Sequence, residues 1–184
     1  MAVGPLSDQD IEATLRTRYL EPVVVPAWRV VWDGDPPLQG SDRDGRWTPL
    51  GVSVLYTSLL EDGALAEIGL RVFRQPAMPD RPHRCHRIEV TTNHTLRIES
   101  PDELSALGVD IAAYKNFDYH ETQRIASIAY HQLGADSLIV PCARWECSNL
   151  VLFLDRLPGN PTFRMGNSTR VDWDAFKPRY DSRP

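Results

Sequence analysis

The sequence predicts a single α+β domain. Helical and strand patterns are interspersed along the 184 residues without the regular alternation that builds a doubly wound parallel sheet. The chain has no glycine-rich phosphate loop of the P-loop or G-x-G-x-x-G type, which argues against a Rossmann domain. With 42% hydrophobic residues it is long enough to bury one core, and no internal repeat or low-complexity tract divides it.

A turn followed by a short strand brings a cation and a phenol close together in the sequence. Pro49 and Gly51 mark the turn, which also carries Arg46. Residues 52–56 are mostly apolar, which is typical of a strand, and they end in Tyr56.

A helix is predicted directly after this strand. Ser58 and Glu61 have the spacing of a capping box, and apolar residues at helical spacing continue to Val72. Glu67 lies on the margin of this apolar stripe, four residues before Arg71. An exposed ion pair with Arg71 is therefore one interpretation of Glu67, and a functional carboxylate is the other.

The remaining elements follow from the same patterns. Helices are predicted over 11–19 with a capping box at Ser7 and Asp10, briefly after Ser100, and over 118–133. Strands are predicted over 23–32, 85–91, 95–98, 137–140 and 149–154, the segment 95–98 pairing with 85–91 and the last two strands being buried. Loops are predicted over 33–44 and 75–87, and 162–171 is either a hairpin or an edge strand.

Charge and composition exclude several classes of protein. The net charge of −5 and the pI near 5.5 give no footprint for direct nucleic-acid or anionic-membrane binding, and no apolar run approaches the roughly 20 residues of a membrane span. Residues 1–8 lack the pattern of a signal peptide, so we expect a cytoplasmic protein. Three cysteines are too few for a disulfide framework. His83, Cys85 and His86 match no structural zinc spacing, so we expect no metal.

Two blocks of sequence resemble the RES domain family. The first is GRWTPLGVSVLYTSLLEDGALAEIGLRV at 45–72, and the second is GADSLIVPCAR at 134–144 followed by NLVLF at 149–153. The likeness spans Trp28 to Phe153. It implies a fold similar to that of ADP-ribosyltransferases, in which small twisted mixed sheets hold NAD in a cleft. The expected organisation is an N-terminal helix and lead-in at 1–22, a RES-like NAD-binding core at 23–155, and a C-terminal extension of the same domain at 156–184.

The resemblance assigns four residues to an NAD site. Cleavage of the bond between nicotinamide and ribose develops positive charge on the sugar, so a carboxylate near the ribose lowers the barrier, a role that suits Glu67. Arg29 and Arg46 suit the diphosphate, because a guanidinium binds phosphate oxygens in a fork and stays charged. Tyr56 offers a ring to stack on the pyridinium and a hydroxyl for orientation.

The chain departs from the family pattern at two positions. Cys142 stands where the family usually has serine, in a position that the resemblance assigns to NAD binding, and Asp44 stands where many members have a second glycine. Cys142 also permits a different enzyme class, a thiol hydrolase with His120 or His131 as base.

The resemblance implies an NAD-consuming toxin neutralised by an Xre-like antitoxin. The family's outcomes are hydrolysis, phosphorolysis with inorganic phosphate as co-substrate, or ADP-ribosyl transfer, and the sequence does not choose among them. NAD is the substrate, so no resident cofactor is expected. A catalytically silent interaction module remains a further alternative, and a homo-oligomer is left open.

Overall fold

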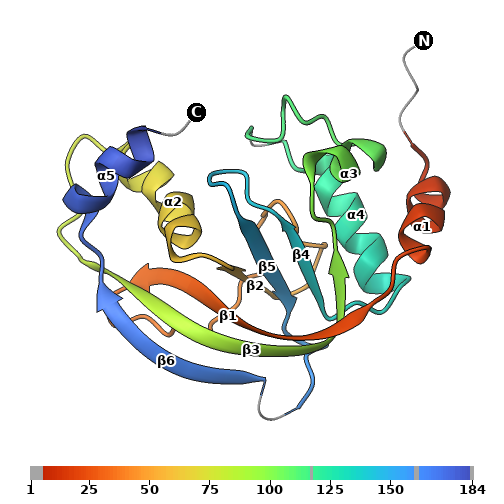
Figure 1. Ribbon diagram of the computed structural model, residues 1–184, viewed down its shortest axis with the longest axis horizontal. Helices are drawn as coiled ribbons and strands as arrows, with labels where there is room; N and C mark the ends of the chain where they lie inside the picture. The colour runs from red at the N-terminus through yellow and green to blue at the C-terminus, as the bar shows by residue number, and fades with distance from the viewer. Residues whose placement is uncertain (1–5, 117, 160–161, 183–184) are drawn as a thin grey trace.

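The computed structural model describes residues 6–116, 118–159 and 162–182, and within them strands and helices are interspersed as a mixed α+β fold (Figure 1). The strands are β1 Glu21–Trp32, β2 Val54–Ser58, β3 His83–Arg97, β4 Ser137–Pro141, β5 Ser148–Phe153 and β6 Phe163–Arg170. The helices are α1 Asp8–Arg16, α2 Glu61–Val72, α3 Pro101–Ala106, α4 His120–His131 and α5 Trp173–Asp181. The expectation about a signal peptide falls largely on residues 1–5, which lie outside the described residues.

The strands form one mixed sheet that closes on itself. Their order is β1-β2-β5-β4-β3-β6, and β1 also pairs with β3 along its length, from Glu21 opposite Thr95 to Trp32 opposite His83. The pairing of β3 with β4 is parallel, and the other pairings are antiparallel. The predicted α+β class is therefore confirmed.

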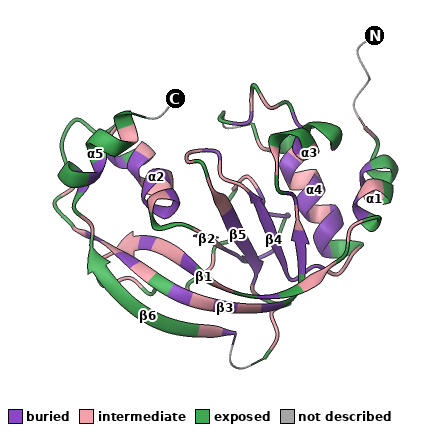
Figure 2. Cartoon of the chain, in the orientation of Figure 1, coloured by how far each residue is buried: buried purple, intermediate pink, exposed green. Residues whose placement is uncertain are grey.

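The closed sheet contributes a core of its own. Apolar residues from its five ring strands pack together in one buried cluster: Ala27, Leu55, Ile88, Val90, Ile139, Leu150 and Leu152. Residues of β4 and β5 are buried almost without interruption, as their continuous apolar runs predict. Strand β6 lies at the outer edge of β3 and is largely exposed, which decides for an edge strand over a hairpin (Figure 2).

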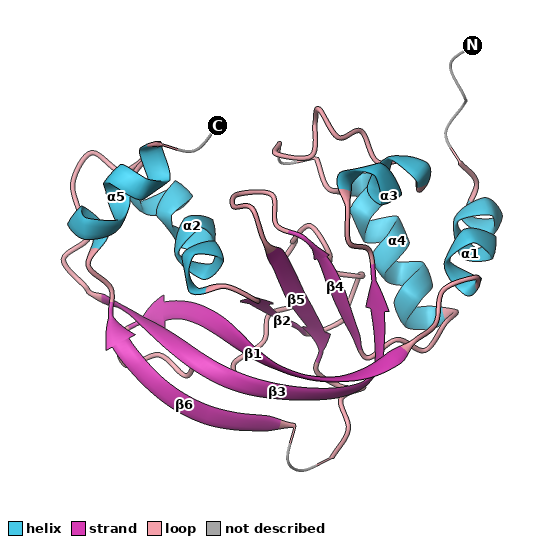
Figure 3. Ribbon diagram, in the orientation of Figure 1, coloured by secondary structure: helices cyan, strands magenta, loops and turns pink. Residues whose placement is uncertain are grey.

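Two groups of helices pack on this sheet and complete the core. Helices α1, α3 and α4 form one group, and α2 and α5 form the other, with β4 and β5 between the two groups in the view of Figure 3. In the first group, Ile11, Leu104 and Ile125 join buried residues of β4 and β5. In the second, Ala66 and Phe176 join buried residues of β1 and β3.

The predicted pairing of 95–98 with 85–91 is wrong, because both segments belong to the single strand β3. The backbone N–H groups of Asn93 and His94 donate to Oδ2 of Asp136 at 2.7 and 3.0 Å. This buried carboxylate satisfies two donors in the polar part of β3, so the chain continues there as a strand. The predicted loop over 75–87 is likewise too long, since β3 begins at His83.

The predicted capping box at Ser58 and Glu61 is also wrong. Helix α2 begins at Glu61, and its N-cap residue is Leu60, which makes no side-chain cap. Ser58 is instead the last residue of β2, where it pairs with Trp28 of β1 and Asn149 of β5. The capping box of Ser7 and Asp10 is confirmed at the start of α1.

Candidate active site

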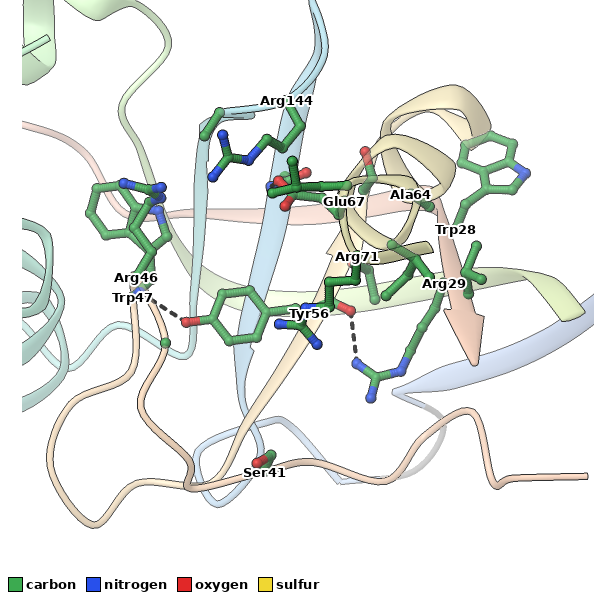
Figure 4. A pocket seen from close by; sticks show the side chains of 18 of the residues that line it. Trp28, Arg29, Ser41, Arg46, Trp47, Tyr56, Ala64, Glu67, Arg71 and Arg144 are labelled. Carbon is green, nitrogen blue, oxygen red and sulfur yellow. Dashed lines mark hydrogen bonds between the residues drawn. The ribbon is translucent and has the colours of Figure 1, made fainter. Parts of the chain in front are cut away.

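A cavity of about 520 Å³ lies where β1, β2, α2 and the ends of β4 and β5 meet the turn at 43–47. Figure 4 shows Arg46 and Trp47 at one end of this cavity and Arg29 at the other, with Tyr56 and Glu67 between them. The four residues that the resemblance assigns to an NAD site therefore line one cavity, although they are spread over positions 29 to 67 of the sequence.

The carboxylate of Glu67 is held by two donors from the opposite wall. Its Oε1 accepts a hydrogen bond from the thiol of Cys142 at 3.2 Å and another from Nδ2 of Asn149 at 3.0 Å. The predicted ion pair with Arg71 is not found among the salt bridges of the described residues, although Arg71 lines the same cavity. Both of these hydrogen bonds meet Oε1 of the carboxylate.

Asn149 reaches Glu67 from the start of β5. Its backbone lies between Val140 of β4 and Ser58 of β2, so the side chain is fixed at the centre of the sheet. An ionised carboxylate only accepts hydrogen bonds, which identifies the atom facing Glu67 as the amide nitrogen. The amide oxygen of Asn149 is buried and has no partner within the described residues.

Cys142 lies directly after β4 and is not among the residues that line the cavity, although its thiol donates to Glu67. The neighbouring thiol of Cys147, burial and the Glu67 carboxylate raise the pKa of Cys142. The proposed bases of a thiol hydrolase lie elsewhere: His120 contacts Glu121, and neither it nor His131 lines the cavity. The geometry thus gives the thiol-hydrolase interpretation no support.

The turn that carries Arg46 is fixed by close packing. A side chain at Gly45 would place its Cβ 2.8 Å from Oγ1 of Thr48 and 2.9 Å from the hydroxyl of Tyr56, so only glycine fits there. Nε2 of Gln123 in α4 donates to the carbonyl of Gly45 at 3.0 Å. The loop is thereby attached to both the sheet and a helix.

The guanidinium of Arg46 lies against two aromatic rings. Its central carbon is 4.5 Å from the ring centroid of Tyr114 and 4.8 Å from that of Tyr119. Nη2 donates to the carbonyl of Asn116 at 3.0 Å, whereas Nη1 is buried without a partner within the described residues. This donor is the kind of group that an anionic ligand satisfies.

Tyr56 uses its hydroxyl to hold the same turn. The hydroxyl accepts from the backbone N–H of Trp47 at 2.8 Å and shares a 2.9 Å hydrogen bond with Oγ1 of Thr48. Burial raises the pKa of Tyr56 to about 12, so the phenol is neutral at physiological pH. The hydroxyl is thus engaged by the turn, and the ring is the part of Tyr56 left to orient a ligand.

Arg29 is anchored inside the fold. Nη1 donates to the carbonyl of Tyr56 at 2.8 Å and Nη2 to that of Gln39 at 2.9 Å, while Nε is buried without a partner within the described residues. Burial lowers the pKa of Arg29 to about 10, which still leaves it charged at neutral pH. The alternative that it stands on a solvated edge strand is wrong, because β1 is flanked by β2 and β3.

Several residues that line the cavity have no role predicted from the sequence. Asn149 was recognised only as part of an apolar run, although a single amide within such a run is itself a signal. Arg144 lies in the second sequence block but was assigned no role. The other lining residues without an assigned role include Trp28, Ser41, Arg43 and Tyr119.

Charges in the cavity are strongly asymmetric. Among its lining residues are five arginines and two carboxylates: Arg29, Arg43, Arg46, Arg71, Arg144, Asp44 and Glu67. Such a site suits a ligand that carries phosphate groups and that develops positive charge beside one fixed carboxylate.

His83 at the start of β3 belongs to the core. His83 is buried, stacks on Trp32 with ring centroids 3.8 Å apart, and accepts a hydrogen bond from Nε1 of Trp173 at 3.2 Å. In the part of the chain that the structure describes, no group of three or more candidate ligands could hold a metal ion. Among the same described residues, no helix is long and apolar enough to span a membrane.

Comparison with known proteins places the chain in one family. No curated protein matches it. A chain in the crystal structure of the M. tuberculosis MbcT-MbcA toxin-antitoxin complex is similar, with a TM-score of 0.78 and 16% identity, over 95% of this chain and 98% of that one. At this identity the likeness shows a common fold. Residues 26–174, most of the sequence, match the RES domain, and the chain therefore belongs to the RES domain family.

Proposed function

We propose that this protein consumes NAD by cleaving the bond between nicotinamide and ribose. The observation that carries the proposal is the carboxylate of Glu67, which is held by Cys142 and Asn149 on the wall of a cavity otherwise rich in guanidinium groups. A fixed carboxylate stabilises the positive charge that develops on the ribose, while the departing nicotinamide becomes neutral.

The cationic residues fit the other end of the same ligand. Nη1 of Arg46 and Nε of Arg29, which have no hydrogen-bond partner among the described residues, are suitable donors to the diphosphate. The ring of Tyr56, on the cavity wall, offers a stacking surface for the pyridinium. Water, inorganic phosphate or a protein side chain could then attack the ribose carbon, which gives hydrolysis, phosphorolysis or ADP-ribosyl transfer respectively.

The proposal also includes a toxin role and a protein partner. Membership of the RES domain family and the shared fold with a chain of a toxin–antitoxin complex support a toxin that an antitoxin neutralises. We propose an Xre-like, DNA-binding antitoxin, because the net charge of −5 leaves this chain poorly suited to contact DNA directly. Recovery of a small DNA-binding protein in a pull-down from the native host would support this partner, and recovery of none would count against it.

The activity can be tested with purified protein and NAD. We expect release of free nicotinamide, measured by chromatography. The second product separates the three outcomes: ADP-ribose indicates hydrolysis, a phosphorylated ADP-ribose formed only with added phosphate indicates phosphorolysis, and labelled protein indicates transfer. The variant Glu67→Gln is the matched negative control. Absence of nicotinamide release from the folded wild-type protein would instead favour a catalytically silent interaction module.

A further inference from the structure

Cys142 and Cys147 face each other across the turn between β4 and β5. The antiparallel register of these strands pairs Pro141 with Ser148, and the next pair along it is Cys142 with Cys147. The backbone N–H of Cys142 donates to the carbonyl of Cys147 at 2.9 Å, which shows that the ladder continues to this pair. Side chains of directly opposed residues point to the same face of a sheet, so the two thiols are neighbours.

This arrangement suits a disulfide without movement of the backbone. Opposed residues in an antiparallel ladder have Cα atoms roughly 4.5 to 5.5 Å apart. That separation lies within the range of about 4.4 to 6.8 Å that a disulfide bridges. Both cysteines are free and only partly buried, so a small oxidant can reach them.

Each thiol also contacts a neighbour that matters to the site. The sulfur of Cys147 lies 3.4 Å from Oγ of Ser58, and both atoms lie against Gly63 of α2, where any side chain would overlap them. The thiol of Cys142 donates to Oε1 of Glu67 at 3.2 Å. A chemical modification of this cysteine pair therefore alters the surroundings of the Glu67 carboxylate directly, through the hydrogen bond from Cys142.

We propose that Cys142 and Cys147 form a modification site that peroxides oxidise to an intramolecular disulfide, and that the disulfide lowers the activity that depends on Glu67. The formation of the bond is independent of what the protein does, whereas its effect on turnover rests on the proposed NAD cleavage. Transient disulfides in proteins of reducing compartments are typically redox-sensing, which suits a pair placed beside a reactive carboxylate.

The chemistry balances with hydrogen peroxide as the oxidant. The thiolate of Cys147 attacks one peroxide oxygen, the O–O bond breaks, and a sulfenic acid and one water result after proton uptake. The thiol of Cys142 then displaces the sulfenic hydroxyl as a second water, and the S–S bond forms. Two thiols and one peroxide thus give one disulfide and two waters. The pKa of Cys142 is raised by the neighbouring Cys147, by burial and by Glu67, so Cys142 stays a thiol. Cys147 therefore supplies the thiolate that reacts first.

Oxidation removes the donor that Cys142 presents to Glu67. A disulfide sulfur carries no hydrogen, so Oε1 would keep only the hydrogen bond from Asn149. A hydrogen bond to a charged group contributes enough that its loss corresponds to roughly a tenfold effect. We therefore expect about tenfold slower NAD turnover in the oxidised protein and full recovery after reduction.

The first experiment measures the bond itself. The purified protein is treated with hydrogen peroxide, denatured and alkylated. Because the chain has three cysteines, we expect three alkylated thiols before treatment and one after it, with a peptide map linking Cys142 to Cys147. The variant Cys85→Ala removes the remaining thiol and should form the same bond. An intermolecular disulfide, or oxidation to sulfinic acid without a disulfide, would overturn the proposal.

The second experiment measures nicotinamide release by the same samples. Cys147→Ser cannot form the bond but keeps the contact between Cys142 and Glu67, so its turnover should not respond to peroxide. If this variant fails to fold, reversal of the wild-type loss by dithiothreitol provides the same information. An equal, irreversible loss in wild type and variant would overturn the regulatory effect. Absence of turnover in the reduced wild type would instead reject the proposed function and leave the disulfide result standing.

Discussion

Glu67 and Asn149 share a 3.0 Å hydrogen bond in which the side-chain amide donates to the carboxylate, and this bond links α2 to β5 across 82 residues of sequence. The helix alone leaves the Glu67 side chain free to choose among several rotamers. The amide from the centre of the sheet selects one of them, which fixes the carboxylate at the cavity wall. A charge that is fixed before the substrate binds costs no reorganisation during the reaction.

The first prediction concerns the charge of Glu67. Glu67→Gln keeps the size and one acceptor oxygen, so the contacts from Cys142 and Asn149 can persist and the folding stability should barely change. Removing one preorganised electrostatic group costs about 3 kcal/mol at the barrier, so nicotinamide release should fall on the order of 10²-fold. Glu61→Gln, in the first turn of the same helix, is the matched control and should retain activity. Equal turnover in Glu67→Gln and wild type would reject the role.

The second prediction concerns Asn149 as the residue that positions Glu67. Asn149→Ala should lower kcat about tenfold with little change in the KM for NAD, because the ground-state contacts of the diphosphate remain. Asn149→Asp keeps the shape but replaces the donor by a second negative charge, so its kcat should fall further. A purely structural Asn149 predicts a different result, in which thermal unfolding shifts while kcat stays at the wild-type value.

The third prediction separates the two arginines. Arg29→Ala and Arg46→Ala should each weaken NAD binding by roughly 1.5 to 3 kcal/mol, measured by titration calorimetry. Arg29→Ala should also lower the free energy of unfolding, because it leaves the carbonyls of Tyr56 and Gln39 without their donor. Arg164→Ala on the exposed strand β6 is the matched control. If both Arg29→Ala and Arg46→Ala bind NAD as tightly as the wild type, the assignment of these arginines to the NAD diphosphate is wrong.

The sequence predicts those parts of the fold that depend on local patterns. The apolar runs at 137–140 and 149–154 correspond to β4 and β5, and the helical spacing before Gly134 corresponds to α4. The continuation of β3 through Asn93 and His94 is not predictable in this way, since it depends on the carboxylate of Asp136, far along the chain. Local polarity there resembles a turn, and a tertiary hydrogen bond reverses that preference.

The same division applies to the site. The resemblance supplied Arg29, Arg46, Tyr56 and Glu67, and the structure brings all of them to one cavity. Their partners could not be inferred from the sequence, because each is contributed by another element: Asn149 from β5 to Glu67, and Tyr114 from the 107–119 segment to Arg46. The roles of these residues in NAD cleavage stay predictions until turnover is measured.

The fourth prediction is a loss of stability in mild alkali. Burial, with a smaller contribution from Glu61, raises the pKa of Cys85 from 9.0 to about 12. Above about pH 9 the unfolded chain therefore releases a proton that the folded chain retains, so the free energy of unfolding falls as pH rises. Each such thiol contributes a slope of at most about 1.4 kcal/mol per pH unit.

Arg29 acts in the opposite direction at higher pH. Its pKa is lowered from 12.5 to about 10, so the cost of burying its charge is relieved, and the free energy of unfolding rises, only as pH increases above about 10. The interval from about pH 9 to about pH 10 is therefore where the thiol effect is clearest. Urea unfolding across this interval should show the decline, and Cys85→Ala should make it shallower. A variant with the wild-type slope would show that Cys85 is not responsible.

The last prediction concerns the residue at which this chain differs from the family pattern. The thiol of Cys142 is a weak donor, and it donates to Oε1 of Glu67. A serine hydroxyl is a stronger donor of smaller size, so Cys142→Ser should retain or increase NAD turnover if the residue only positions the carboxylate. Alkylation of Cys142 should then inhibit through bulk alone.

A nucleophilic Cys142 predicts the opposite outcome for the same variant. A hydroxyl without an adjacent base is a far weaker nucleophile at neutral pH than a thiolate, so Cys142→Ser would lose nearly all activity. The geometry favours the positioning role, because the Cys147 thiol, burial and Glu67 raise the pKa of Cys142 and keep the thiol protonated. The decisive measurements are nicotinamide release, NAD binding and thermal unfolding of Cys142→Ser. A folded variant that binds NAD but releases no nicotinamide would overturn the positioning role in favour of covalent thiol chemistry.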